Sequence, residues 1–421
     1  MNAHVAIFTV PIPALINPTF SLVATLIRRG YRVSYVTSER YAAEISALGA
    51  EVVRCPRLES PFDQDDDEAM PIEYQYVKGT RDLAPRVFSL SIPFYKKHRP
   101  ELVIYDSMAF AGRLIADRLE VPALRMSNQT SYDRETIDSG IVPLDWKEKE
   151  LELERHGNQF FASHGSSRVN MIRENKEHTF YLYLEELQLG KSFDDQEFFY
   201  APRCIAERPN VPRWTPMRGN RPVALMSSST TYSQNIEFTK NCLAALARSG
   251  WDTVLAVGSN NLAAFSPLPV NCHPFLNLPS AAVMPHVDLL ISGAGLATAM
   301  EAAYHGCPIL MLTGGHSELE MYARRFQECG VGVHLGKVDA TPDRVAQWAN
   351  RMIDDSETKT KIRRVQNAVR TGAGAEELVN WIENRSGLIQ RRELHRRRPL
   401  FHGPVRPDHI GPTPAHQSAT S

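Results

Sequence analysis

The chain has 421 residues, more than one hydrophobic core usually serves, so its length predicts two domains. Hydrophobic residues make up 43% of the chain and charged residues 23%, as in ordinary globular proteins. The net charge of -1 gives no electrostatic reason to expect nucleic acid or an acidic membrane surface as a partner.

The same survey predicts a cytoplasmic protein. The opening residues lack a signal-peptide pattern, and no apolar run approaches the roughly 18 residues that a membrane span needs. The six cysteines are scattered without a C-x-x-C pair, so we expect free thiols, no zinc site and no disulfide framework.

Short apolar segments alternate with helical patterns in the first part of the chain. Residues 5–10 and 32–37 predict strands, and the apolar spacing between them, ended by Gly30, predicts a helix. A further strand at 102–106 is followed by a helical pattern over 109–119. This alternation predicts an α/β fold with a parallel sheet and helices on both faces.

The later parts of the chain predict how these elements are grouped. Residues 140–195 are rich in charged and aromatic side chains and are interpreted as helices. Many prolines and no periodicity then mark a linker, after which the strand–helix pattern restarts. The predicted organisation is an N-terminal domain 1–205, a linker 206–221, a C-terminal domain 222–385 and a disordered basic and proline-rich tail 386–421.

The turn after the first predicted strand is unusual because it is apolar. Open α/β sheets bind ligands at the carboxyl ends of their strands, so this turn is where functional side chains are expected. Here residues 11–16 read PIPALI, which neither accept nor donate a proton. Asp106 ends the strand at 102–106 and would lie at the same edge.

Four segments of the chain resemble bacterial macrolide-type, nucleotide-sugar-dependent glycosyltransferases. They read INPTFSLVATLIRRGYRVSYVT (16–37), IYDSMAFAGRLIADRLEVPALR (104–125), DLLISGAGLATAMEAAYHGCPILML (288–312) and ELEMYARRFQECGVGVHL (318–335). The resemblance covers the chain to about residue 385 and is specific in order and spacing. It implies the GT-B architecture, two doubly wound, Rossmann-like domains that face a cleft.

On the acceptor side, the resemblance implies a histidine base that an aspartate orients. A hydroxyl is a weak nucleophile until a base takes its proton. The histidine position is Leu15 here, between Pro13 and Asn17 of the expected acceptor side, and the aspartate remains as Asp106. The turn is therefore apolar because the proton acceptor has been replaced.

On the donor side, the resemblance implies a histidine at the pyrophosphate, a glycine-rich helix start and a glutamate for the ribose. The histidine position is Gly293, whereas Gly295, Thr298 and Glu301 keep the rest. A helix N-terminus holds an anion through its free N–H groups, so we expect weakened rather than abolished phosphate binding.

Further donor positions also depart from the family. The residues that face the nucleobase align with Asn277 and Ser280, and the pair that grips the sugar aligns with Glu318 and Leu319. Upstream, the hydroxyl run that includes Ser229 and Thr230 replaces a glycine and would hydrogen-bond a phosphate, or merely end a strand.

Two residues are candidates for the missing base. Asp106 would take the proton itself, and His316 would do so from the loop that faces the sugar. The alternative roles are structural: Asp106 would cap the next helix, His316 would be a surface-loop histidine, and Glu301 an exposed helical glutamate.

The resulting hypothesis is a non-classical glycosyltransferase of natural-product metabolism. It would need no resident cofactor, would use a UDP- or dTDP-linked sugar, and would act on a hydrophobic small molecule. One alternative is an inactive pseudoenzyme that binds a protein partner of the same pathway or a small molecule. Another is a GT-B enzyme repurposed for different chemistry.

Overall fold

The computed structural model describes residues 3–55, 72–128, 130, 148, 152, 155, 158–165, 178–189, 198–207, 209, 211, 214, 215, 220–227, 235–257, 262–276 and 280–385. These residues form two compact units. The first unit contains those up to Pro209 and those from Ala368 onward, and the second contains those in between. The predicted tail 386–421 and half of the predicted linker lie outside the described residues.

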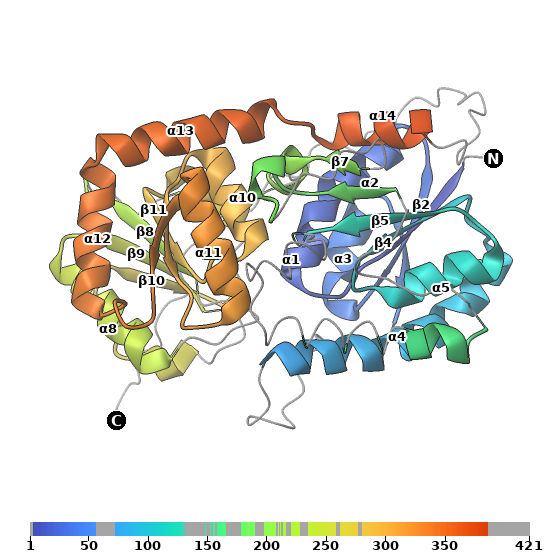
Figure 1. The fold of residues 1–421 in the computed structure, drawn as a ribbon, viewed down its shortest axis with the longest axis horizontal. Helices are drawn as coiled ribbons and strands as arrows, with labels where there is room; N and C mark the ends of the chain where they lie inside the picture. Colours follow the sequence, from blue (N-terminus) through green and yellow to red (C-terminus); the bar gives the residue numbers. More distant parts are fainter. Residues whose placement is uncertain are drawn as a thin grey trace, which may run out of the picture. The chain divides into compact units, whose positions relative to one another are not determined.

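The sheet of the first unit has seven parallel strands in the order β3-β2-β1-β4-β5-β6-β7 (Figure 1). The strands predicted at 5–10, 32–37 and 102–106 are present as β1, β2 and β4. The strands are β1 (His4–Phe8), β2 (Arg32–Thr37), β3 (Glu51–Arg54), β4 (Leu102–Asp106), β5 (Ala123–Ser127), β6 (Thr179–Tyr181) and β7 (Phe198–Tyr200).

Strand β6 corrects the expectation that residues 140–195 are helical throughout. Thr179–Tyr181 pairs with β5 on one side and β7 on the other. Its threonine and aromatic side chains suit a pleated, buried surface, and Phe180 is fully buried. The nearby charged residues dominate the composition of this region and mask the short strand.

Helices cover both faces of this sheet. On one face, α4 and α5 pack on a core that includes Phe8 and Tyr105. A Cβ atom at Gly112 of α5 would lie 2.8 Å from Phe8 Cβ and 2.7 Å from Tyr105 Cβ, so only glycine lets α5 approach β1 and β4 this closely. The helices are α1 (Pro13–Ile16), α2 (Phe20–Arg28), α3 (Glu39–Ala47), α4 (Ile72–Lys97), α5 (Phe110–Leu119) and α14 (Ala375–Arg385), with a 3-10 turn at Asn17–Thr19.

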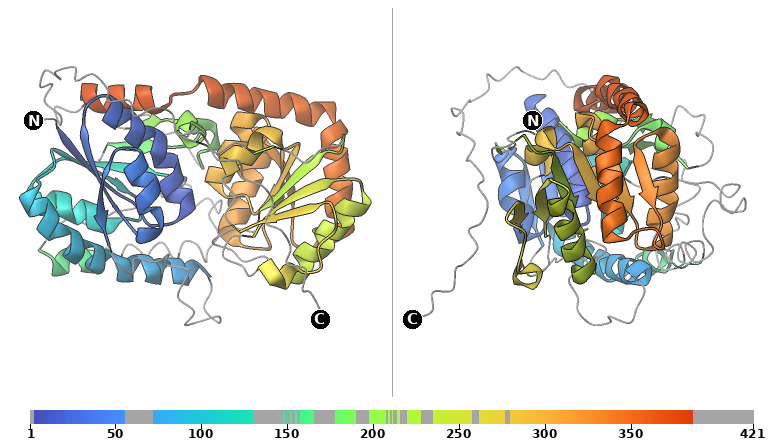
Figure 2. Two further views of the ribbon diagram at one scale, coloured as in Figure 1. Left: turned by 180° about the vertical axis from the view of Figure 1, so that it is seen from behind. Right: turned by 90° about the vertical axis from the view of Figure 1, so that its left-hand side faces the viewer.

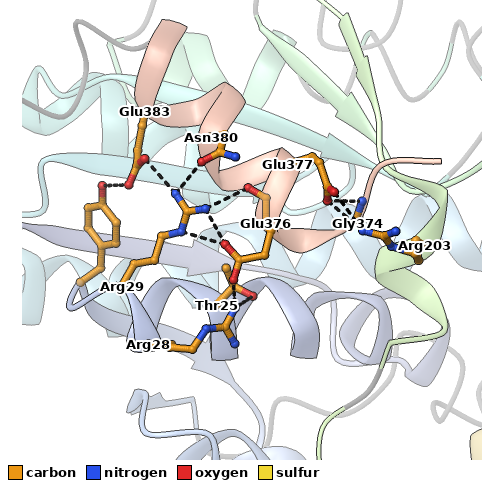
Figure 3. Close-up of polar contacts among 10 residues, drawn as sticks. Thr25, Arg28, Arg29, Arg203, Gly374, Glu376, Glu377, Asn380 and Glu383 are labelled. Carbon is orange, nitrogen blue, oxygen red and sulfur yellow. Dashed lines mark hydrogen bonds and ion pairs between the residues drawn. The ribbon is translucent and has the colours of Figure 1, made fainter. Parts of the chain in front are cut away.

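Helix α14 belongs to the first unit, which differs from the predicted C-terminal domain 222–385. Figure 3 shows the charged contacts that fasten it to α2. Arg29 donates to Glu376 (3.0 Å), Asn380 (2.8 Å) and Glu383 (2.9 Å), and Tyr31 also donates to Glu383. These partners are about 350 positions apart in the chain, so local sequence patterns do not reveal the pairing.

The second unit repeats the architecture with six parallel strands in the order β10-β9-β8-β11-β12-β13 (Figure 2). The strands are β8 (Val223–Ser227), β9 (Asp252–Ala256), β10 (Cys272–Phe275), β11 (Leu289–Ser292), β12 (Ile309–Leu312) and β13 (Gly332–Leu335). The helices are α8 (Ile236–Arg248), α9 (Ser280–Val283), α10 (Leu296–His305), α11 (Ser317–Cys329), α12 (Pro342–Asp354) and α13 (Ser356–Thr371). Among the helices of the described residues, none combines the length and the apolar character that crossing a bilayer requires.

Candidate active site

The strand order of each unit creates a point where connections leave in opposite directions. In the first unit, β1 lies between β2 and β4, and Phe8 pairs with Tyr105. The turn that follows β1 and the residue that ends β4 therefore meet at the carboxyl edge of the sheet. Ligands of open α/β folds bind at such switch points, so this edge is where acceptor chemistry is expected.

The turn after β1 forms an apolar cluster. Leu15, on the single-turn helix α1, is buried with Val10, Ile12 and Met108. Pro13 begins α1 and Asn17 follows it, and both are half-buried. The cluster joins the expected acceptor turn to the segment just after Asp106, because Met108 comes from that segment.

Asp106 is the last residue of β4 and is fully buried. Its Oδ1 atom accepts a hydrogen bond from the Met108 N–H at 2.9 Å, whereas Oδ2 has no partner among the described residues. Burial raises the pKa of Asp106 to about 7, against the lowering effects of the Met108 N–H and the Arg125 charge. The carboxyl therefore gains and loses its proton near neutral pH.

The hydroxyl groups nearest this edge are committed to one another. Thr19 donates to the Ile16 carbonyl (2.7 Å), so at 3.0 Å it must accept from Tyr35, which in turn accepts from Thr9 at 3.0 Å. The pKa of Tyr35 is raised, first by burial, and the Asp106 charge adds to the rise. This chain of hydroxyls fixes the 3-10 turn against β2.

In the second unit, the corresponding edge lies after β11. The chain passes through Gly293 and Ala294 to Gly295, which precedes α10 and is exposed. Ala294 has a positive φ of 68°, which costs about 1 kcal/mol for a residue with a Cβ. Thr298 lies half-buried in the first turn of α10. The arrangement presents the N–H groups of a helix start, which suits an anion.

Glu301 of α10 is buried and accepts a hydrogen bond from the Ser280 hydroxyl. Ser280 occupies a position where the resemblance expects a contact to the nucleobase. The serine therefore lies beside the glutamate expected to bind the ribose, and the two residues form one polar group on α9 and α10. The expectation that Glu301 is an exposed helical glutamate is wrong.

Two of the unusual donor positions are neighbours in space. A Cβ atom at Gly293 would lie 3.4 Å from Leu319 Cδ1, which is an ordinary contact distance. Leu319 and Glu318 occupy the first turn of α11 and both are buried. His316 precedes this helix and is half-buried, beside two glycines with positive φ.

A polar cluster that the sequence did not reveal pins the start of α11. Thr313, after β12, donates to Glu320, and the Thr313 hydroxyl lies 3.1 Å from His334 Nε2. Since the hydroxyl proton goes to Glu320, His334 must donate from Nε2 to Thr313. Glu320 also lies 3.5 Å from His334 Nε2. No sequence signal links these three residues.

The remaining candidates have no described environment. Ser229, Thr230 and Asn277 lie outside the described residues. Asp106 belongs to the first unit, whereas His316 and the described donor candidates belong to the second. Within the part of the chain that the structure describes, histidine, cysteine and acidic side chains do not gather in threes or more as metal ligands would.

Comparison with known proteins finds similarity to glycosyltransferases. Residues 240–384 match the family described as "Erythromycin biosynthesis protein CIII-like, C-terminal domain". The NDP-glycosyltransferase YjiC of Bacillus licheniformis is 25% identical over 91% of this chain and 97% of its own. The chain is thus similar to a glycosyltransferase over nine-tenths of its length.

Two further similar proteins are also named as sugar transferases. The demethyllactenocin mycarosyltransferase of Streptomyces fradiae is 26% identical over 90% of this chain and 86% of its own. The crystal structure of the calicheamicin glycosyltransferase CalG4 matches with a TM-score of 0.72, at 23% identity, over 91% of this chain and 99% of that one. The fold similarity thus extends over both units.

Proposed function

We propose that this protein transfers a sugar from a nucleotide-activated donor to a hydrophobic small molecule of natural-product metabolism, with Asp106 as the proton acceptor. The observation that carries the proposal is the buried carboxyl of Asp106, whose Oδ2 lacks a partner among the described residues at a switch point of the sheet. A buried polar atom without a hydrogen-bond partner lowers the stability of the fold. A ligand that donates a hydrogen bond to Oδ2 would explain why the carboxyl is present there.

The reaction would follow from the groups on the two sheet edges. The acceptor nucleophile gives its proton to Asp106 and bonds to the anomeric carbon of the sugar. The bond between that carbon and the diphosphate oxygen breaks, and the nucleoside diphosphate leaves with the electron pair. The start of α10 would stabilise the leaving diphosphate, and Glu301 with Ser280 would hold its ribose.

The apolar cluster around Leu15 supports a hydrophobic acceptor. Its four members are buried together with the partly buried Leu83 against them, so a ligand that enters at the acceptor edge would meet aliphatic and thioether side chains. Removing about 100 Å² of apolar ligand surface from water would favour binding by about 2.5 kcal/mol. The names of the relatives, which include a mycarosyltransferase, support an acceptor from natural-product metabolism.

Calorimetric titration of the purified chain with UDP and dTDP tests the donor half of the proposal. Micromolar binding that Glu301→Ala weakens would support it and justify a screen of activated sugars. Absence of binding at millimolar nucleotide would contradict it.

One observation favours a second candidate, a binding protein without catalysis. Asp106 is fully enclosed and an apolar side chain stands at Leu15, where the resemblance implies a base. Such a pseudoenzyme would bind a small molecule or a protein of the same pathway. It would bind a hydrophobic acceptor with equal affinity in the presence and absence of nucleotide, and would not turn over any activated sugar.

A further inference from the structure

Asn128 follows the strand next to that of Asp106 and has a fixed orientation. It follows β5, is buried, and donates from Nδ2 to the carbonyl of Ala14 in α1 at 2.8 Å. The donor nitrogen is thereby identified, so the other amide atom, Oδ1, is an acceptor. Oδ1 is buried and no described residue donates to it.

The strand register brings this oxygen to the same edge as Asp106. Asp106 pairs with Met126 of β5, and the Ser107 N–H donates to the Met126 carbonyl at 2.9 Å. Asn128 lies two residues beyond Met126, just after the end of β5, and its bond to the Ala14 carbonyl directs the side chain toward the turn after β1. Two buried acceptor oxygens, Asp106 Oδ2 and Asn128 Oδ1, therefore end adjacent strands.

No hydrogen-bond donor of the described residues bonds to either of these two oxygens. The Tyr35 proton is already given to Thr19. Arg125 attracts the charged form of Asp106, yet its Nε atom, like the hydroxyls of Ser107 and Thr130, lacks a hydrogen bond within the described part of the chain. Both oxygens thus lack a donor, although unpartnered donors are present in the same region, and a ligand that carries at least two N–H or O–H donors would match the two oxygens.

We propose that the acceptor of this enzyme attacks through nitrogen, as a hydrophobic primary amine that donates one N–H to Asp106 Oδ2 and another to Asn128 Oδ1. This inference rests on the proposed function and names its acceptor class. A single alcohol has one proton and satisfies one of the two oxygens, whereas an amine satisfies both. Asn128 is then the residue that selects nitrogen over oxygen.

The acid–base chemistry agrees with this choice. Burial raises the pKa of Asp106 to about 7. An α-amino group has a pKa of about 8, whereas that of bulk water is about 16, so a carboxylate of this strength accepts a proton from an ammonium far more readily than from a hydroxyl. A neutral amine is also a nucleophile without help from a strong base, and Leu15 stands where the resemblance implies such a base.

The step balances without a further reactant. The ammonium gives one proton to the Asp106 carboxylate, and the neutral nitrogen forms a C–N bond to the anomeric carbon. The C–O bond to the nucleoside diphosphate breaks, and the leaving group keeps the electron pair. The second nitrogen-bound proton then passes to solvent. For the amine to enter, α1 must shift, since it carries both Leu15 and the carbonyl that holds Asn128.

The test compares 2-naphthylmethylamine with 2-naphthylmethanol, a pair that differs only in the nucleophile. The full chain is incubated with UDP-glucose or dTDP-glucose and each acceptor, and products are measured by mass spectrometry. We expect the amine to be glycosylated at least tenfold faster than the alcohol. Equal or faster transfer to the alcohol would overturn the inference while leaving the proposed function intact.

Variants assign the selectivity to Asn128. Asn128→Ala should lower the amine-to-alcohol ratio about tenfold, whereas Asn128→Gln, which keeps both an amide donor and an amide acceptor, should lower it less. Asn380→Ala on α14 is the matched control and should leave the ratio unchanged. A ratio that Asn128→Ala does not alter would contradict the assigned role.

If neither acceptor is glycosylated, the proposed function fails, and binding still decides the inference. Calorimetry should then show the amine binding at least tenfold more tightly than the alcohol, with the difference lost in Asn128→Ala. Equal affinities for the two compounds would overturn the amine site.

Discussion

The carboxyl edges of the two sheets treat their buried polar groups differently. At the first, Asp106 Oδ2 and Asn128 Oδ1 have no donor among the described residues. At the second, Glu301 is bonded to Ser280, and Glu320 to Thr313. A buried polar group without a hydrogen-bond partner lowers the stability of the fold. Such a group is therefore expected where a ligand supplies the missing hydrogen bond. The contrast concerns these acidic and amide side chains, since the buried Ser292 hydroxyl at the end of β11 in the second unit also lacks a partner.

The second edge is destabilised by its main chain. Its unfavourable feature is the positive φ of Ala294, in the turn before α10. Backbone strain of this sort persists where the surrounding structure enforces it and is frequent at ligand sites. The two edges thus store unfavourable free energy in a side chain and in the main chain, respectively.

Removal of the Asp106 charge should have the largest effect and tests the difference between the two edges most directly. If the unmet carboxyl is the proton acceptor, Asp106→Asn should lower the transfer rate by about 10²–10³-fold. Turnover of an activated sugar with an accepted substrate, followed by mass spectrometry, measures this. Asp117→Asn on α5 is the control and should retain most of the activity. An unchanged rate in Asp106→Asn would exclude a catalytic role.

The same substitution should stabilise the fold at high pH. The folded-state pKa of Asp106, about 7, lies above the ordinary value of 3.8, so the folded chain binds this proton more tightly than the unfolded chain. The stability that the proton provides is present below pH 4 and is lost as pH rises to about 7. Asp106→Asn should therefore exceed wild type by roughly 2 kcal/mol at pH 8 and match it at pH 4 in urea unfolding.

The Glu301–Ser280 pair offers a test of the second edge. Glu301→Ala should weaken UDP binding about tenfold if its carboxylate holds the ribose, which corresponds to about 1.4 kcal/mol. Calorimetry measures the effect, and Glu328→Ala on the exposed side of α11 is the control. Equal affinity in Glu301→Ala and wild type would remove ribose binding from this residue.

The smallest expected effect is that of Glu320→Gln on the free energy of unfolding, and its sign is opposite to that of Asp106→Asn. Glu320→Gln also exchanges a carboxylate for an amide, but Glu320 already accepts from Thr313 and lies beside His334. It should lower the free energy of unfolding by about 1 kcal/mol at pH 7. Glu328 forms a largely exposed ion pair with Arg325, so Glu328→Gln should change the free energy of unfolding little. If Glu320→Gln stabilises the fold, the carboxylates of the two edges do not differ in the way proposed.

The sequence by itself determined the doubly wound fold, and it predicted the candidate site residues. Strands β1, β2, β4, β8, β9, β11 and β12 follow from short apolar segments, because a strand and its neighbouring helix are encoded by nearby residues. The resemblance drew attention to Asp106 and Leu15, and their environments agree with a carboxyl at a strand end beside an apolar turn.

Only the tertiary structure decided what depends on distant residues. It placed α14 on the first unit through Arg29 and Glu376, joined Thr313 to His334, and aimed Asn128 through the carbonyl of Ala14. It also showed the strand at Thr179–Tyr181 within a charged region. These features arise from pairing across the sheet and between helices, whereas periodicity reports only on residues within a few positions of one another.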